Sequence, residues 1–178
     1  AEALFRHANE ALGAVRRFPV PVVAAVNGVA LGGGAELALA CDFRVAAAHA
    51  AIGFVQGRLN ISTGFGGGTD LVQLVGAHRA LSLLIGAEIL DAEKARAAGL
   101  FDAVASENEP LEACVDRFLE PLRAHVPQVL RAFKALALGS RLGLSRGERE
   151  RSEQSEFVQT WIHPDHWAAA DRLLARNA

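Results

Sequence analysis

The most constraining feature of this sequence is a short apolar run that leads through glycines into a helix-forming segment. The run Val22–Val26 is rich in β-branched residues, which is typical of a buried strand. Asn27-Gly28 favours a turn, and the glycines at 32–34 precede a helix predicted over Ala35–Ala40. This order predicts an α/β fold with unpaired backbone amides at the start of that helix.

The rest of the chain divides into an alternating part and a helical part. We expect further helices over Ala1–Arg17, Thr69–Val75, Arg79–Ile85 and Ala92–Ala98, strands over Phe43–Val45, Ala51–Val55 and Phe101–Val104, and a glycine-rich loop over Gly57–Gly68. Asp91 is expected to cap the Ala92 helix, because its carboxylate can accept from first-turn amides. After Pro110 only helical patterns remain, over Leu111–Arg123, Gln128–Leu138, Ser145–Trp161 and His166–Arg176. The sequence predicts one domain, with a core over residues 1–105 and a helical C-terminal part over 106–178.

Composition excludes several classes of protein. Among 178 residues, 18 Lys and Arg oppose 20 Asp and Glu, so there is no basic surface typical of a dedicated nucleic-acid binder. The longest apolar stretch, around Pro19–Ala35, is interrupted by Pro, Asn and Gly, so no membrane partner is expected. Two cysteines exclude a disulfide framework and favour a cytoplasmic location. Methionine is absent, so we expect that an N-terminal part of the protein is not included.

The glycine spacing does not fit the common phosphate-binding motifs. The glycines at 28 and 32–34 do not form G-x-G-x-x-G, and no Gly-Lys-Ser/Thr follows them. Two interpretations remain open. The glycines let the backbone approach a ligand at a helix start that favours negative charge, or they serve the packing of a tight turn alone.

The wider string resembles a known family. Pro21–Asp42 closely resembles the signature of the crotonase (enoyl-CoA hydratase/isomerase) superfamily, and Gly66–Leu71 resembles its second glycine motif. Leu90–Leu100 is similar to its following helix-and-turn segment, so the likeness runs in order over about Phe18–Val104. This resemblance implies the crotonase (ClpP-like) spiral of β-β-α turns, with a helical C-terminal extension.

The resemblance also implies an oxyanion hole for an acyl-CoA thioester. Crotonase-like enzymes hold the thioester oxygen between two backbone N–H groups, and Gly33 matches one of these donors. Nothing before Phe18 resembles the segment that supplies the other donor, so the N-terminal part of the family domain is expected to be absent from this sequence. Ala30 and Leu31, just before the glycines, are expected to contact the substrate.

Two further positions match the acid/base residues of family hydratases. Glu36 matches the first catalytic glutamate, although a glutamate there could also merely complement the helix dipole. The second glutamate position holds Gln56, whose amide can hydrogen-bond but cannot take up a proton near neutral pH. Gly64 matches a family glycine near the acyl group, and Thr63 and Phe65 are expected to shape the acyl pocket.

The choice of reaction follows from the glutamine. The segments 41–44, 52–56 and 159–161 look more like ethylmalonyl-CoA and methylmalonyl-CoA decarboxylases than hydratases. A glutamate about 4 Å from a malonyl-type carboxylate would repel it by roughly 4 kcal/mol, whereas a neutral amide can hydrogen-bond it. Decarboxylation is therefore preferred. The alternatives are an enoyl-CoA hydratase that uses Glu36 alone and a non-catalytic acyl-CoA-binding subunit.

Partners and cofactors follow from the same resemblance. The acyl-CoA thioester is expected as substrate, with no other cofactor and no metal, and His163 and His166 are not expected to bind one. A homotrimer or a dimer of trimers is expected, with apolar stripes on Leu111–Arg123 and Gln128–Leu138. Arg172 and Arg176 are expected to approach the CoA phosphates. Arg58 is either an anchor for the substrate carboxylate or a surface residue.

Overall fold

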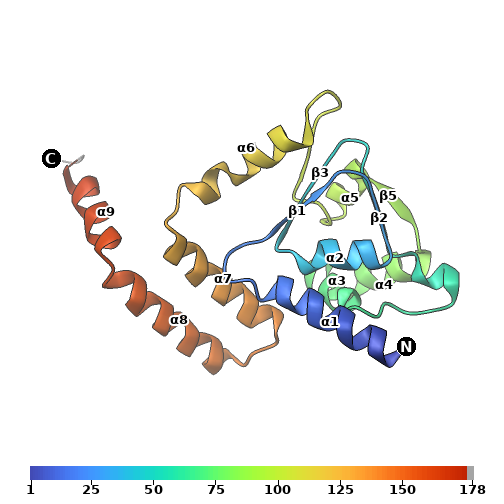
Figure 1. Ribbon diagram of the computed structural model, residues 1–178, viewed down its shortest axis with the longest axis horizontal. Coiled ribbons are helices and arrows are strands. Elements are labelled where there is room, and N and C mark those ends of the chain that lie inside the picture. The colour runs from blue at the N-terminus through green and yellow to red at the C-terminus, as the bar shows by residue number, and fades with distance from the viewer. Residues whose placement is uncertain (176–178) are drawn as a thin grey trace. The chain divides into compact units, whose positions relative to one another are not determined.

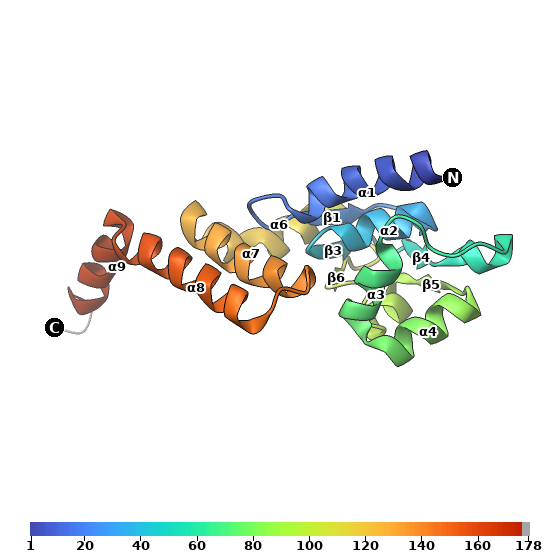
Figure 2. The same cartoon turned by 90° about the horizontal axis from the view of Figure 1, so that it is seen from below.

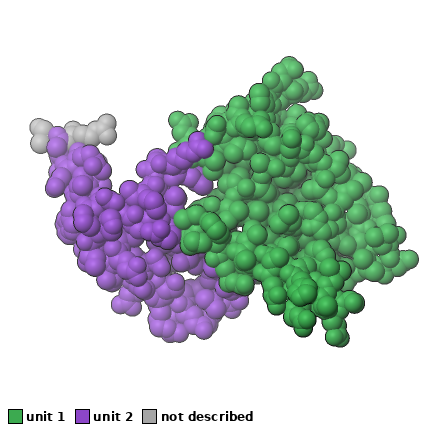
Figure 3. Space-filling view, in the orientation of Figure 1, with its two compact units in different colours: residues 1–120 green, residues 121–178 purple. Residues whose placement is uncertain are grey.

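The structure, a computed structural model, describes residues 1–175. The chain divides into two compact units, residues 1–120 and the residues from 121 onward, which Figure 3 colours separately. The first unit contains all the described strands, and the described part of the second unit is helical.

Two small sheets form the centre of the first unit, and consecutive strands alternate between them. One sheet is parallel and has the order β1 (Val23–Val26), β3 (Phe43–Ala46), β6 (Ala103–Val104). The other has the order β2 (Val29–Leu31), β4 (Ala51–Gly53), β5 (Ile89–Asp91), with β4 parallel to β2 and antiparallel to β5. Each turn of the chain therefore adds one strand to each sheet before a helix, and the predicted β-β-α spiral is confirmed.

The pitch of this spiral is fixed by the strand register. Val23 pairs with Phe43 and Val26 with Ala46, so β1 and β3 are offset by 20 residues. The parallel arrangement buries β3 almost completely, as expected for a strand covered on both faces. Residues one turn apart in sequence are consequently neighbours in space.

Helices surround the two sheets. In chain order they are α1 (Glu2–Arg16), α2 (Gly33–Ala40), the 3₁₀ helix η1 (Val55–Leu59), α3 (Gly67–Val75), α4 (Ala77–Gly86), α5 (Ala92–Ala97) and α6 (Leu111–Arg123), which begins in the first unit. α1 packs on α2, and α2 packs on α3, as Figures 1 and 2 both show. The core between helices and sheets includes the fully buried side chains of Leu39, Val45, Ile52, Phe54 and Leu71.

Most predicted elements are confirmed, with differences at glycines and at very short strands. α2 begins at Gly33 rather than Ala35 and α3 at Gly67 rather than Thr69, because glycines supply their first turns. The strand predicted to run to Val55 ends at Gly53, and η1 follows it. β2 and β5 were not predicted, since three residues carry too little periodicity to be recognised.

The predicted cap at Asp91 is confirmed. Its Oδ1 accepts a hydrogen bond of 2.9 Å from the backbone N–H of Lys94. That hydrogen bond lowers the pKa of the Asp91 carboxyl, which favours the ionised form at the positive end of α5.

The described part of the second unit consists of helices with a small buried surface. After the end of α6 come α7 (Pro127–Arg141), α8 (Arg146–Trp161) and α9 (Pro164–Ala175), and α7 packs on α8. Ser145 and Glu148 form a capping box at the start of α8. No described helix has the length and apolarity that crossing a membrane requires.

Candidate active site

The site is built around the start of α2. Gly32 precedes this helix with φ of +53°, a left-handed conformation that glycine adopts without strain and that turns the chain from β2 into α2. Within the described part of the chain, the amides of Gly33 and Gly34 have no hydrogen-bond acceptor. They therefore present N–H groups at the positive end of a helix, where a developing negative charge is stabilised.

The Glu36 side chain lies in the first turn of α2 and is 2% exposed. Its Oε2 accepts hydrogen bonds from the backbone N–H groups of Phe65 at 2.8 Å and Gly67 at 2.9 Å. Its Oε1 accepts from Gln56 Nε2 at 2.9 Å and from the Gly64 N–H at 3.4 Å. Both carboxylate oxygens are thus held by N–H donors, three of them from one loop.

Gln56, in η1, is the second buried polar side chain of the site, at 8% exposed. Because its nitrogen donates to Glu36, the amide orientation places Oε1 away from that contact. Oε1 is buried and has no hydrogen-bond partner among the described residues. A buried acceptor without a donor is costly, so this atom is suited to meet an N–H or O–H of a ligand or water.

The spiral explains why these two residues meet. Glu36 and Gln56 are 20 residues apart, which equals the offset between β1 and β3. Gln56 therefore lies one turn of the spiral after Glu36, and a motif that is far apart in sequence becomes a hydrogen-bonded pair.

The predicted loop residues lie beside the same helix start. A Cβ added to Gly33 would be 2.9 Å from Cε2 of Phe65, so the Phe65 ring lies against Gly33. A Cβ on Gly67 would be 2.6 Å from the Cβ of Glu36 and 2.8 Å from its Cα, so only glycine allows this approach. The structure thus brings Gly33, Glu36, Gln56, Gly64 and Phe65 together.

The sequence analysis did not identify the residues that hold this loop from its other side. Arg16 donates from Nε to Asp70 Oδ2 at 2.8 Å and from Nη2 to the Phe65 carbonyl at 2.9 Å. Asn9 Nδ2 donates to the Gly64 carbonyl at 2.9 Å. An arginine and an asparagine on a predicted amphipathic helix give no sign of such contacts, because the pairing spans about 50 residues.

Other predicted residues are placed less directly. Ala30 and Leu31 are half-buried in β2, and Leu31 Cδ2 lies beside Gly53 of the neighbouring strand. Thr63 packs against Gly68 within the loop region. Arg58 is exposed. Their contacts with a substrate remain predictions.

The described residues contain no group of three or more His, Cys, Asp or Glu side chains that could hold a metal ion. Cys41, predicted to be a small core residue, is buried at the end of α2. The second cysteine, Cys114, is also buried, and burial raises the pKa of its thiol.

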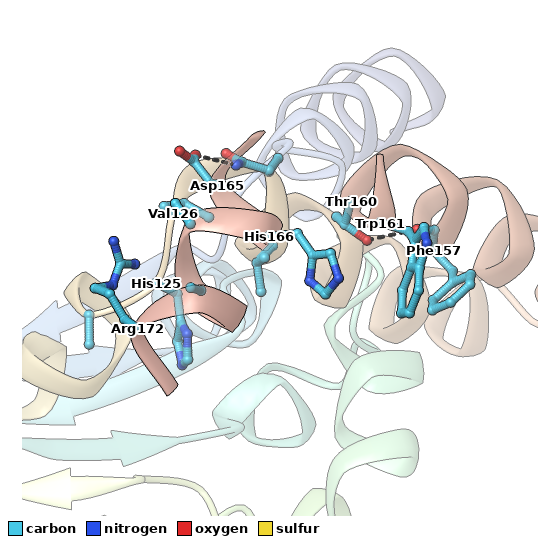
Figure 4. A pocket seen from close by; sticks show the side chains of 13 residues that line it. His125, Val126, Phe157, Thr160, Trp161, Asp165, His166 and Arg172 are labelled. Atoms are coloured by element: carbon cyan, nitrogen blue, oxygen red, sulfur yellow. Dashed lines mark hydrogen bonds between the residues drawn. The ribbon is translucent and has the colours of Figure 1, made fainter. Parts of the chain in front are cut away.

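A separate hollow of about 530 Å³ lies within the second unit (Figure 4). Phe157, Trp161, His166 and Arg172 line it, and the rings of Trp161 and His166 are 4.6 Å apart. Arg172 is exposed here, and Arg176, the other arginine expected near CoA phosphates, lies outside the described residues. The hollow combines aromatic rings with a cation.

Comparison with known proteins identifies the family. Residues 2–166 match the model of the family described as enoyl-CoA hydratase/isomerase, and the chain belongs to this family. The predicted crotonase membership is confirmed.

Relatives of known function include both predicted reactions. The chain is 39% identical to the mitochondrial methylglutaconyl-CoA hydratase of Mus musculus over 130 residues, which is 73% of this chain and 41% of that protein. It is 40% identical to the ethylmalonyl-CoA decarboxylase of Bos taurus over 159 residues, which is 88% of this chain and 51% of that protein. The chain therefore spans about half or less of the length of these relatives.

Solved structures agree on the fold. The enoyl-CoA hydratase of Bacillus anthracis superimposes with a TM-score of 0.87 at 30% identity, covering 99% of this chain and 69% of the hydratase. A Thermobifida fusca structure solved in complex with CoA has a TM-score of 0.79 at 30% identity, covering 89% of this chain and 61% of that one. The crotonase fold is thereby confirmed.

Proposed function

We propose that this protein acts on an acyl-CoA thioester through an enolate and that its preferred reaction is decarboxylation of a malonyl-type CoA ester. The thioester oxygen would lie at the Gly33 amide, whose N–H has no acceptor in the described part of the chain. A donor fixed in advance at a developing oxyanion is worth about 2.7–4 kcal/mol of transition-state stabilisation. The relative solved with CoA supports this choice of ligand.

The observation that carries the choice of reaction is the occupied state of Glu36. Hydration needs a carboxylate that can take a proton from water, but both oxygens of Glu36 accept N–H hydrogen bonds and its side chain is buried. Gln56 cannot take up a proton either. Decarboxylation needs no base, because the electron pair of the broken carbon–carbon bond passes into the enolate as CO₂ leaves. A water then supplies the proton for the α-carbon.

The orientation of Gln56 refines the role given to it from sequence. Its nitrogen already donates to Glu36, so only its second N–H could meet a substrate carboxylate. The unpartnered Oε1 is suited to accept from the water that protonates the enolate. Gln56 would thus place a water rather than bind the carboxylate as its main task.

The same acceptor supports a second candidate function, hydration of an enoyl-CoA. A water bound at Gln56 Oε1 could add to a double bond if Glu36 left one of its donors to receive the proton. The 3.4 Å contact with the Gly64 N–H is the longest of the four and would be the first to break. The hydratase relative from Mus musculus supports this candidate.

We further propose assembly with second copies of the chain, as a trimer or a dimer of trimers. The second unit exposes Phe133, Phe157, Trp161 and Trp167, each about half accessible. Large exposed aromatic side chains in one region are typical of surfaces that associate. Sedimentation that finds only monomer at micromolar concentration would contradict this assembly.

The decisive experiment compares two substrates and one substitution. Rates of CO₂ release from methylmalonyl-CoA or ethylmalonyl-CoA and of hydration of crotonyl-CoA are measured for the unaltered protein and for Gln56→Glu. The new carboxylate would lie beside Glu36 and near the substrate carboxylate, so decarboxylation should fall on the order of 10²-fold. Hydration should be unchanged or faster, since two adjacent carboxyls share one proton that can be transferred.

Gln154→Glu provides a matched control, because Gln154 is an exposed glutamine of α8 and its substitution adds the same charge elsewhere. It should change neither rate. Efficient hydration by the unaltered protein without CO₂ release would overturn the decarboxylase proposal in favour of the hydratase. Binding of CoA esters without turnover of either substrate would support the acyl-CoA-binding subunit.

A further inference from the structure

The loop that holds Glu36 is itself held by α1. Arg16 reaches Asp70 Oδ2 with both Nε and Nη2 at 2.8 Å, and its Nη2 also donates to the Phe65 carbonyl at 2.9 Å. Asn9 Nδ2 donates to the Gly64 carbonyl at 2.9 Å. One helix therefore contacts two successive peptide groups of the loop and the helix that follows it.

The same residues of the loop are bound on two sides. The N–H groups of Gly64 and Phe65 donate to Glu36, and their carbonyls accept from Asn9 and Arg16. Each of these two residues is thus fixed through both of its backbone polar groups. Neither peptide group can rotate without breaking a contact to Glu36 or to α1.

The ion pair within this arrangement is shielded from water. The side chains of Arg16 and Asp70 are 11% and 6% exposed. Gly66 lies directly beneath the guanidinium, since a Cβ added there would be 2.8 Å from Arg16 Nη2, and its φ is +84°. A glycine at this position therefore provides both the left-handed turn and the space that Arg16 occupies.

We propose that Arg16, Asp70 and Asn9 are positioning residues that fix the Gly64–Gly67 loop and, through it, the Glu36 carboxylate and the Phe65 ring beside the Gly33 amide. This role in turnover rests on the proposed function. A displacement of about 1 Å in a reacting geometry can cost on the order of 10²-fold in rate. Loosening the loop acts on the carboxylate, the aromatic ring and the oxyanion donor together.

The test compares Arg16→Gln with Arg17→Gln, which removes the same charge from the exposed neighbouring residue. Hydrogen exchange of the peptide covering residues 63–70 should become at least about 10-fold faster in Arg16→Gln and stay unchanged in Arg17→Gln. Exchange in β3 should remain slow in both variants. This measurement needs no substrate, so it decides the role of the contacts in holding the loop even if the proposed reaction is wrong.

Turnover then separates positioning from general stability. Below the unfolding temperature, kcat of Arg16→Gln on the active substrate should fall about 10- to 100-fold, while KM changes less than about threefold. Arg16→Lys keeps the charge but lacks the planar fork that reaches both Asp70 and Phe65, so it should give an intermediate kcat. The double variant with Asp70→Asn should lose no more than the larger single loss, because the residues act as one unit.

Asn9→Ala keeps the test valid if Arg16→Gln fails to fold, because alanine favours the helix and only the contact to Gly64 is lost. It should speed exchange of the same peptide and lower kcat a few-fold. Unchanged exchange in Arg16→Gln, or in Asn9→Ala when Arg16→Gln does not fold, would overturn the proposal. Faster exchange with an unchanged kcat would also overturn it, because the loop would then be held without positioning the site.

Discussion

Two helices of this protein bury very different fractions of their residues. α2 has eight residues and buries five of them, whereas α8 has sixteen and buries none. α2 has no side-chain cap and depends on the surrounding unit, while α8 begins with a capping box formed by Ser145 and Glu148. The first unit therefore stabilises its helices by tertiary packing, and the second relies more on local interactions.

The difference follows the distribution of polar groups as well. Glu36 and Gln56 are buried near α2 and bonded to each other, so the polar site is part of the first unit's core. In the second unit the large apolar side chains, among them Phe157 and Trp161, are about half exposed. Substituting equivalent residue types in both units tests this comparison directly.

The largest effect is expected from a leucine pair. Leu71 in α3 is fully buried, so Leu71→Ala should lower the free energy of unfolding by about 2–5 kcal/mol through lost burial and a cavity. Leu173 in α9 is 63% exposed, and Leu173→Ala should change it by less than about 0.5 kcal/mol. Urea unfolding of both variants measures the difference.

A cost for Leu173→Ala that approaches that of Leu71→Ala would break the comparison. It would mean that an assembly covers this face of α9 in solution. Repeating the measurement over a range of protein concentrations separates the two cases, because stabilisation by association depends on concentration.

A glycine pair should give a smaller but opposite contrast. Gly67→Ala would push a methyl group against the Glu36 backbone, and overpacking of this kind costs about 1–3 kcal/mol. Gly147 in α8 has open surroundings, with Arg151 Nη1 at 3.5 Å from the added Cβ, so Gly147→Ala should be neutral or stabilise by up to about 1 kcal/mol. Thermal unfolding of the two variants should shift in opposite directions or differ clearly. A destabilising Gly147→Ala would show that the surface of α8 is covered.

The smallest expected effect concerns the start of α8. Ser145→Ala removes the side-chain acceptor for the Glu148 N–H and should cost about 1 kcal/mol. Ser155→Ala, inside the same helix and exposed, should be neutral or slightly stabilising because alanine has the higher helix propensity. Hydrogen exchange in α8 distinguishes the variants, and equal exchange would show that the cap contributes nothing.

The site could be predicted from sequence where one local string carries the information. The glycines before α2, Glu36 within it and Gln56 one spiral turn later were identified because their spacing belongs to a recognisable motif. The bond between Glu36 and the backbone of Phe65 and Gly67 could not be predicted, since a main-chain N–H has no residue signature.

The contacts of Arg16 and Asn9 lay beyond prediction for a related reason. Their amphipathic helix fixes which face is buried, but not which of its polar residues meets a loop some 50 residues away. The long helices after Pro110 were predicted nearly to the residue, because their periodicity is local. β2 and β5 were missed because only their partners in the sheet define them.

The fixed pitch of the spiral makes chain length as important as residue identity between Glu36 and Gln56. One inserted residue in β3 or β4 would turn every following side chain of that strand to the opposite face. Gln56 would then leave Glu36, although every residue of the motif would still be present. Insertions and deletions should therefore be tolerated in the exposed turn near Glu107 and rejected between the two residues of the pair.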